Sequence, residues 1–181
     1  GLGLIGASGP GGWIGLAAGT LRCEIMIEVT QAIIGADGRS PLPGFLAARE
    51  GRCVGAHFGT YDYTAGYEIT ASHQRMRHPA CDHAKHMMKL AFAGTGIALS
   101  DGATNIMPVG PHRLTPDRPL TDAQRRENRE AVHRAWKVHF DDVRHSLVNG
   151  FYQGWDLHPA QLPTRYAAVY EFFLSALPAA T

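Results

Sequence analysis

Short apolar runs alternate along the chain with longer segments in which apolar residues recur every three or four positions. Such short runs, flanked by glycine, are typical of strands buried on both faces of a parallel sheet. The longer segments predict amphipathic helices, and Thr121 and Gln124 fit a capping box at the start of the longest one. Strands are therefore expected at residues 22–28, 53–58, 96–100 and 151–157, and helices at residues 41–50, 79–93, 121–149 and 164–177.

Four strand–helix units in succession predict an α/β fold with a parallel sheet, right-handed connections and helices on the outside. Either an open doubly wound sheet or part of a (β/α)8 (TIM) barrel fits this order, and a complete barrel needs about 250 residues. The chain has 181 residues, enough for about half of a barrel. In the last helix, one stripe is expected to face the core: Tyr166, Val169, Tyr170, Phe173 and Leu177.

Composition and charge argue against several classes of protein, among them membrane-spanning, nucleic-acid-binding and disulfide-rich proteins. Residues 1–21 carry no charge and eight of the first twenty are glycine, which predicts an irregular lead before a domain at residues 22–181 rather than a membrane span. The 17 basic and 16 acidic residues nearly balance, which argues against a nucleic-acid partner bound by bulk charge. The three cysteines form no CxxC pair, so we expect neither a disulfide framework nor a zinc finger, and a cytoplasmic location.

An acidic residue ends or follows each predicted strand: Glu28, Asp62, Asp101 and Asp156. Active sites of parallel α/β folds lie at the carboxyl ends of the strands. Carboxylates that converge there repel one another unless they share a hard cation, and oxygen ligands favour Mg²⁺ or Mn²⁺ over zinc. Alternatively, an acid caps a helix or pairs with arginine, which we expect for Asp101 and Asp156. For Glu28 and Asp62 the pattern leaves both interpretations open.

The segment after the second predicted strand combines a glycine with an acid. Gly59 interrupts a buried strand, and Thr60 and Tyr61 then present backbone N–H groups beside Asp62. Free amides at such a turn can hold an anionic group, so a substrate carboxylate bridged to a metal on Asp62 would use both features. His57 precedes the turn and is a candidate proton donor, with a hydrogen-bonded core histidine as the alternative.

Three motifs occur in the order found in one known family: residues 27–31 (Ile-Glu-Val-Thr-Gln), 58–62 (Phe-Gly-Thr-Tyr-Asp) and 154–161 (Gly-Trp-Asp-Leu-His-Pro-Ala-Gln). Over roughly residues 22–178, the chain resembles the C-terminal half of HpcH/HpaI aldolase/citrate lyase β-subunit proteins. These belong to the phosphoenolpyruvate/pyruvate barrel superfamily. The likeness is greatest to an aldolase-like branch with a Gly-Thr-Tyr-Asp-Tyr turn.

The resemblance implies a metal-dependent carbon–carbon lyase or aldolase that acts on a small 2-oxo acid or acyl substrate through a metal-stabilised enolate. It implies that Glu28 and Asp62 hold Mg²⁺ or Mn²⁺. It further implies that Gly59, Thr60 and Tyr61 bind the substrate carboxylate. The family's substrate-binding arginine comes from the N-terminal half of the barrel. We therefore expect the chain to be the C-terminal portion of a longer enzyme, or to assemble as a homo-oligomer.

Two alternatives stand beside this interpretation. Half a barrel exposes two sheet edges, so the chain could instead be a non-catalytic fragment that pairs with another subunit or a second copy. A phosphotransfer enzyme that uses phosphoenolpyruvate would share the metal site. The mass in solution tests the first alternative, and phosphate release tests the second.

Overall fold

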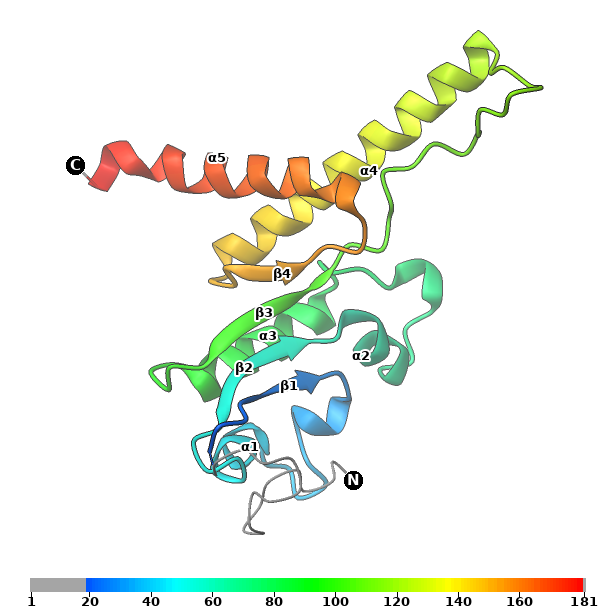
Figure 1. Ribbon diagram of the computed structural model, residues 1–181. Helices are drawn as coiled ribbons and strands as arrows, with labels where there is room; N and C mark the ends of the chain where they lie inside the picture. The colour runs from blue at the N-terminus through cyan, green and yellow to red at the C-terminus, as the bar shows by residue number, and fades with distance from the viewer. Residues whose placement is uncertain (1–18, 181) are drawn as a thin grey trace.

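The computed structural model describes residues 19–180 of the chain, so that most of the predicted lead lies outside the described residues. Its centre is one four-stranded sheet in the order β1-β2-β3-β4, in which all neighbouring strands run parallel (Figure 1). The predicted parallel α/β sheet is thereby confirmed. The strands are β1 (Cys23–Ile27), β2 (Cys53–Phe58), β3 (Ala98–Ala103) and β4 (Gln153–Trp155).

Helices follow each strand, as the apolar periodicity predicted. The α-helices are α1 (Leu42–Ala47), α2 (Thr60–Gly66), α3 (Pro79–Phe92), α4 (Asp122–Val148) and α5 (Leu162–Ala180). Short 3₁₀ turns are η2 (Thr30–Ala32), η3 (Ala71–His73) and η4 (Pro159–Gln161). The predicted capping box at the start of α4 is present, because the Thr121 hydroxyl accepts from the Gln124 N–H and the Gln124 side chain accepts from the Thr121 N–H.

The main core lies between the sheet and α1 and α3, and Figure 1 shows α3 behind the strands. Ile27 of β1 and Phe58 of β2 are 1% exposed and pack in one cluster with Met88 of α3. On the opposite face of the sheet, Met26 and Trp155 remain 39% and 45% exposed. The sheet is therefore covered on one face, whereas its second face carries the side chains that reach solvent.

The predicted core face of the last helix is wrong for four of its five residues. α5 packs on α4 through Ala168, Val169 and Phe172, which belong to one cluster with Val143 and Leu147, so only Val169 of the predicted stripe is confirmed. Apolar residues occur on both sides of α5, and the side that contains Ala168 and Phe172 is the one that packs against α4. The larger predicted residues point away from α4 and are more than half exposed: Tyr166, Tyr170, Phe173 and Leu177.

A bilayer-spanning helix needs about 20 consecutive apolar residues. Between residues 19 and 180, none of the helices has both the length and the apolar character to cross a membrane.

Candidate active site

Two of the four strand-end acids are held in ion pairs inside the protein. Asp101 of β3, 1% exposed, accepts a hydrogen bond from Lys85 Nζ at 2.9 Å. Asp156, just after β4, pairs with Arg165 Nε at 2.6 Å and with His139 Nε2 at 2.8 Å. Burial raises the pKa of Asp156, but the hydrogen bonds and charges of Arg165 and His139 outweigh it and leave the pKa below its ordinary value. Both acids are structural, as expected.

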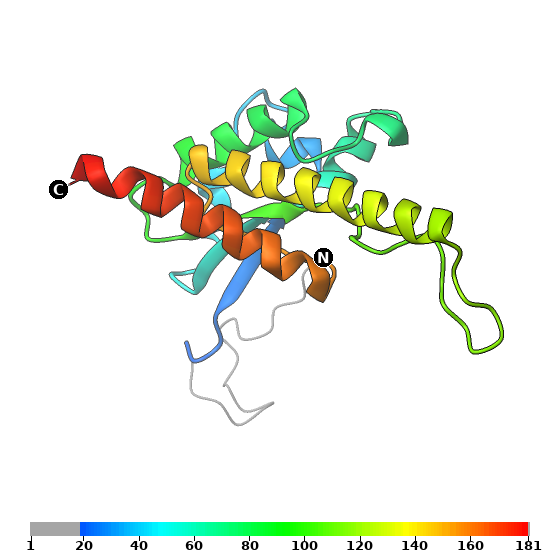
Figure 2. The same ribbon diagram turned by 90° about the horizontal axis from the view of Figure 1, so that it is seen from above.

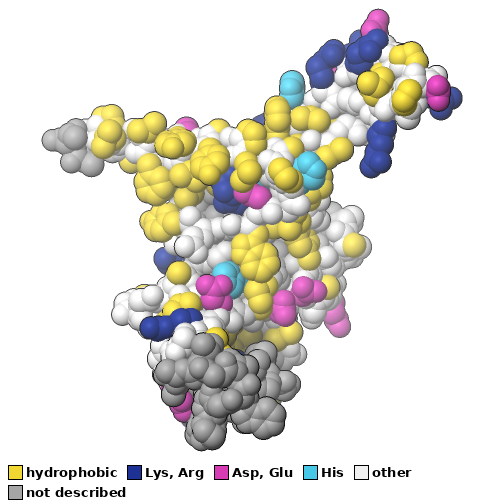
Figure 3. Space-filling view, viewed as in Figure 1, with side chains coloured by type: hydrophobic (Ala, Val, Ile, Leu, Met, Phe, Trp, Pro, Cys, Tyr) yellow, Lys and Arg dark blue, Asp and Glu magenta, His cyan; other side chains and the backbone are white. Residues whose placement is uncertain are grey.

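The other two acids have no such partners. Glu28 follows β1 directly, and Asp62 lies in the first turn of α2, which follows β2. Because Ile27 and Phe58 pair in parallel, Glu28 and Gly59 emerge side by side at the same end of the sheet. Within residues 19–180, neither carboxylate takes part in a hydrogen bond or an ion pair. On this face of the sheet, acidic side chains lie among hydrophobic ones (Figure 3).

Two glycines bring three strand ends close together. A Cβ atom at Gly59 would lie 2.6 Å from Glu28 Cβ and 3.1 Å from Glu28 Oε2. A Cβ atom at Gly102, near the end of β3, would lie 2.3 Å from Thr60 Oγ1. Neither distance is compatible with a side chain. Glycine at both positions therefore allows Glu28, Thr60 and β3 to approach one another.

The segment predicted as an irregular turn forms the first turn of α2. The first helical bond runs from Tyr63 N–H to the Gly59 carbonyl at 3.0 Å, which leaves the N–H groups of Thr60, Tyr61 and Asp62 without an intrahelical acceptor. The Gly59 N–H is not free, because it donates to the Ile27 carbonyl at 2.9 Å and extends the β1–β2 ladder. The amides of Thr60 and Tyr61 thus have no acceptor in the helix, whereas the Gly59 amide, which was also expected to bind substrate, is used by the β1–β2 ladder.

Thr60 Oγ1 is a buried polar atom without a hydrogen-bond partner among the described residues. Thr60 is only 2% exposed. An unsatisfied buried hydroxyl costs about 1–3 kcal/mol, and such a group in a folded protein calls for an explanation. A ligand oxygen or nitrogen at the strand ends would satisfy this hydroxyl.

The Tyr61 side chain has a separate, structural role. Its hydroxyl donates to the Ala103 carbonyl at 2.8 Å and accepts from the Asn105 N–H at 3.0 Å. Burial raises the pKa of Tyr61 to about 12, so the phenol stays protonated at neutral pH. The side chain therefore fastens α2 to the end of β3, and only the backbone amide of Tyr61 is available to a ligand.

His57 lies on β2, two residues before Gly59 and hence on the same side of the strand. Its Nε2 is 2.6 Å from Glu24 Oε2, and its ring centroid is 5.3 Å from that of Trp155. Nδ1 is buried and has no partner among the described residues. A neutral His57 that donates Nε2–H to Glu24 leaves Nδ1 as a hydrogen-bond acceptor. Glu24 was not among the residues expected at the site, although its four-residue spacing from Glu28 places both on one side of the strand.

The residues present fit a hard divalent cation. Among residues 19–180, no group of three or more His, Cys, Asp or Glu side chains gathers into a metal cluster. Mg²⁺ does not need one, since it usually retains several waters and binds through one or two carboxylates together with substrate oxygens. Oxygen ligands such as the carboxylates of Glu28 and Asp62 suit Mg²⁺ or Mn²⁺ better than zinc, which prefers thiolate and imidazole.

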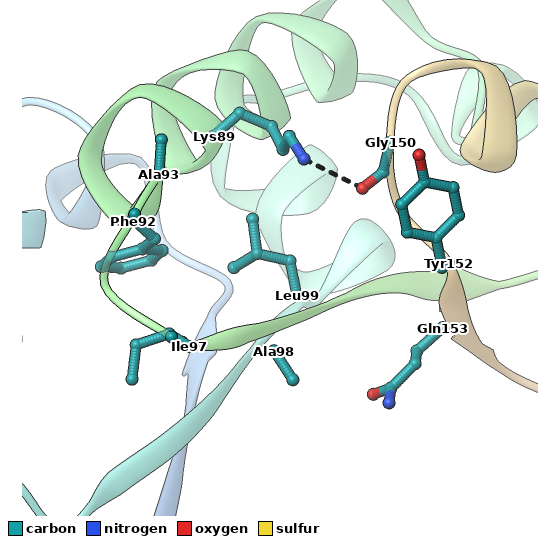
Figure 4. A pocket seen from close by; sticks show the side chains of 11 residues that line it. Lys89, Phe92, Ala93, Ile97, Ala98, Leu99, Gly150, Tyr152 and Gln153 are labelled. Carbon is teal, nitrogen blue, oxygen red and sulfur yellow. Dashed lines mark hydrogen bonds between the residues drawn. The ribbon is translucent and has the colours of Figure 1, made fainter.

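A pocket of about 340 Å³ lies at the opposite end of the strands, where β3 and β4 begin (Figure 4). Leu99 and Tyr152 line it, and Lys89 Nζ at its wall donates to the Gly150 carbonyl at 3.0 Å. No carboxylate or histidine lines this pocket. It therefore has none of the groups required for the predicted chemistry.

Comparison with known proteins places the chain in a family. The model of a domain of unknown function, DUF6986, matches residues 12–181. The chain belongs to this family. No curated protein sequence matches this DUF6986 chain.

Several solved structures have a fold similar to that of this chain. A citrate lyase from Burkholderia xenovorans LB400 is similar with a TM-score of 0.55 at 17% identity, covering 92% of this chain and 46% of that chain. A citrate lyase beta subunit from M. tuberculosis, complexed with oxaloacetate and magnesium, gives a TM-score of 0.50 at 16% identity, covering 80% of this chain and 50% of that chain. The chain thus has an α/β fold similar to that of these citrate lyases and spans about half of their length, which agrees with the coarse family resemblance in the sequence.

Proposed function

We propose that the chain is the C-terminal portion of a (β/α)8 barrel and carries the metal site of a lyase or aldolase. The enzyme would cleave or form a carbon–carbon bond in a small 2-oxo acid or related acyl substrate. The observation that carries this proposal is the contrast among the strand-end acids. Asp101 and Asp156 are tied in ion pairs, whereas Glu28 and Asp62, on adjacent strand ends, have no partner among the described residues. The fold likeness to citrate lyases supports it.

Glu28 and Asp62 are the proposed ligands of Mg²⁺ or Mn²⁺. When bound, the cation supplies a Lewis acid that polarises the substrate carbonyl and stabilises the negative charge that develops as the carbon–carbon bond breaks. The N–H groups of Thr60 and Tyr61 bind the substrate carboxylate in this proposal. Gly59 contributes the space between Glu28 and the start of α2.

His57 is the proposed proton-transfer group. Nδ1 is buried and Nε2 contacts the exposed carboxylate of Glu24, so a proton moved to or from the substrate would pass through the His57 Nε2–Glu24 pair. Trp155 packs against the imidazole and restricts its orientation.

Proton exchange on a simple 2-oxo acid tests this function. With Mg²⁺, the chain is expected to speed the exchange of pyruvate methyl protons with D₂O, followed by proton NMR, because loss of such a proton creates the same charge as bond cleavage. EDTA or Glu28→Gln should abolish the catalysed exchange, and Asp117→Asn, which changes an exposed acid of the loop before α4, should not. Exchange at the buffer rate by a chain that binds both Mg²⁺ and pyruvate would refute the proposal.

A further inference from the structure

The outward side of α5 is a continuous apolar surface. Tyr166, Tyr170 and Leu174 are 59%, 62% and 61% exposed. The Tyr166 and Tyr170 rings lie 6.4 Å apart. The Phe173 ring lies 6.0 Å from that of Tyr152, which is in the connection between α4 and β4. We call this surface the α5 stripe, and its exposed members are Leu162, Tyr166, Tyr170, Phe173, Leu174 and Leu177.

The α5 stripe is larger than the apolar patches found on most monomeric proteins. With roughly half of each side chain exposed, its six members present on the order of 700 Å² of apolar surface. The largest patch on a typical monomer is about 300–600 Å², and a stable interface buries about 800 Å² on each partner. The stripe alone therefore approaches the area that one side of a stable interface requires.

The charged residues of α5 limit which kinds of partner could bind the α5 stripe. The only charged residues of α5 are Arg165 and Glu171, and both are held within the chain. Arg165 pairs with Asp156, and Glu171 pairs with Arg144 of α4. A helix without a free cation does not match nucleic acid or an anionic lipid surface, which recruit Lys and Arg. An uncharged, tyrosine-rich stripe is suited to a surface of the same composition.

We propose that two copies of this chain associate through the α5 stripe, with the two α5 helices antiparallel about a two-fold axis near Tyr170. In an antiparallel pair centred there, Tyr170 meets its own copy and Tyr166 meets Phe173 and Leu174. Each bulky side chain then faces another one, as an isologous interface requires. Figures 1 and 2 show that α5 extends past the sheet, so a second helix can approach it without meeting the strands.

This proposal is independent of the proposed function. Glu28 and Asp62 follow β1 and β2, whereas α5 follows β4, at the other edge of the sheet. Loss of metal binding would leave the α5 contact intact, and loss of the contact would leave the two carboxylates in place.

Sedimentation velocity of the full chain over a concentration series tests the association. The wild type is expected to dimerise, and Tyr166→Ser with Tyr170→Ser should weaken the dimer about 100-fold, since tyrosines at the centre of interfaces contribute most of the affinity. Leu90→Ser is the matched control, because Leu90 on α3 is 77% exposed and lies outside the stripe. Circular dichroism confirms that all three proteins are folded.

A cysteine at the axis tests the geometry. Cys53 and Cys81 are buried and Cys23 is half-buried, so Cys23→Ser serves as the background for this test. In that background, Tyr170→Cys should form a disulfide-linked dimer under mild oxidation, while the unchanged background and Leu90→Cys should not. A wild type that stays monomeric at every concentration would overturn the proposal. A dimer that survives the two serine changes would place the contact elsewhere, for example at the sheet edges. Binding of the stripe to neutral lipid vesicles by a monomeric chain would assign it to a membrane instead.

Discussion

At the scale of single residues, Gly59 decides how closely Glu28, a proposed metal ligand, can approach the start of α2. Its φ of −89° is open to any residue, so glycine is required here by space and not by backbone conformation. The atom that limits the space is Glu28 Cβ, which would lie only 2.6 Å from a Cβ atom at position 59. The size of one side chain therefore controls the position of a proposed ligand.

We expect Gly59→Ala to displace Glu28 and to weaken Mn²⁺ binding about tenfold or more, as changes that misplace a ligand do. The crowding should also cost about 1–3 kcal/mol of unfolding free energy, measured with urea. Gly44→Ala in α1 is the control, because a Cβ atom there meets nothing within 4 Å. Unchanged Mn²⁺ affinity in Gly59→Ala would show that Gly59 does not control the position of a metal ligand.

Sequence patterns found the strand-end acids but not all of their surroundings. The pairing expected for Asp101 and Asp156 is confirmed, whereas the pattern left the roles of Glu28 and Asp62 open and only the family resemblance assigned them to a metal. The contact between Glu24 and His57 joins residues 33 positions apart, which no local pattern contains. The unpaired hydroxyl of Thr60 likewise depends on how β3 packs beside α2.

At the scale of elements, His139 joins α4 to the connection between β4 and α5. His139 is 0% exposed, and its ring nitrogens lie 2.7 Å from Thr164 Oγ1 and 2.8 Å from Asp156 Oδ1. Burial lowers the pKa of His139, although the hydrogen bond and charge of Asp156 partly oppose this. The native fold therefore favours the neutral imidazole.

This pKa shift predicts the direction in which pH changes stability. Below the ordinary histidine pKa of 6.5, the unfolded chain takes up a proton that folded His139 resists, so the unfolding free energy should fall as the pH drops from 7 to 5. Urea midpoints across this range measure the effect. His139→Gln should flatten the pH dependence, and His83→Gln, at an exposed position of α3, should not. If the unfolding free energy of His139→Gln changed with pH as steeply as that of the wild type, the pH dependence could not be assigned to His139.

Periodicity predicted the existence of the elements better than their orientation. The four strands and the long helices lie within a few residues of their expected positions, because buried runs and capping signals are local. α2 was missed, since Gly-Thr-Tyr-Asp is typical of a turn and the helix is only seven residues long. The orientation of α5 was wrong because apolar residues line both of its sides, and only packing against α4 selects one.

At the scale of the whole molecule, the chain spans about half the length of the citrate lyase chains that it resembles. Its sheet is covered on one face by α1 and α3, and on the other face Met26 and Trp155 remain exposed. If the proposed barrel is correct, that second face would be its interior. The barrel would then explain both the exposed apolar side chains of this face and the strand-end carboxylates that have no partner among the described residues.

In the proposed function, this chain by itself positions Glu28 and Asp62 to bind a divalent cation. Calorimetric titration with Mn²⁺ tests this, with and without oxalate as a mimic of the enolate, on the wild type, Asp62→Ala and the control Asp117→Ala. We expect binding that oxalate strengthens in the wild type and in Asp117→Ala, and that disappears in Asp62→Ala. A folded wild type that binds no Mn²⁺, or an Asp62→Ala variant that binds it as tightly, would contradict the claim.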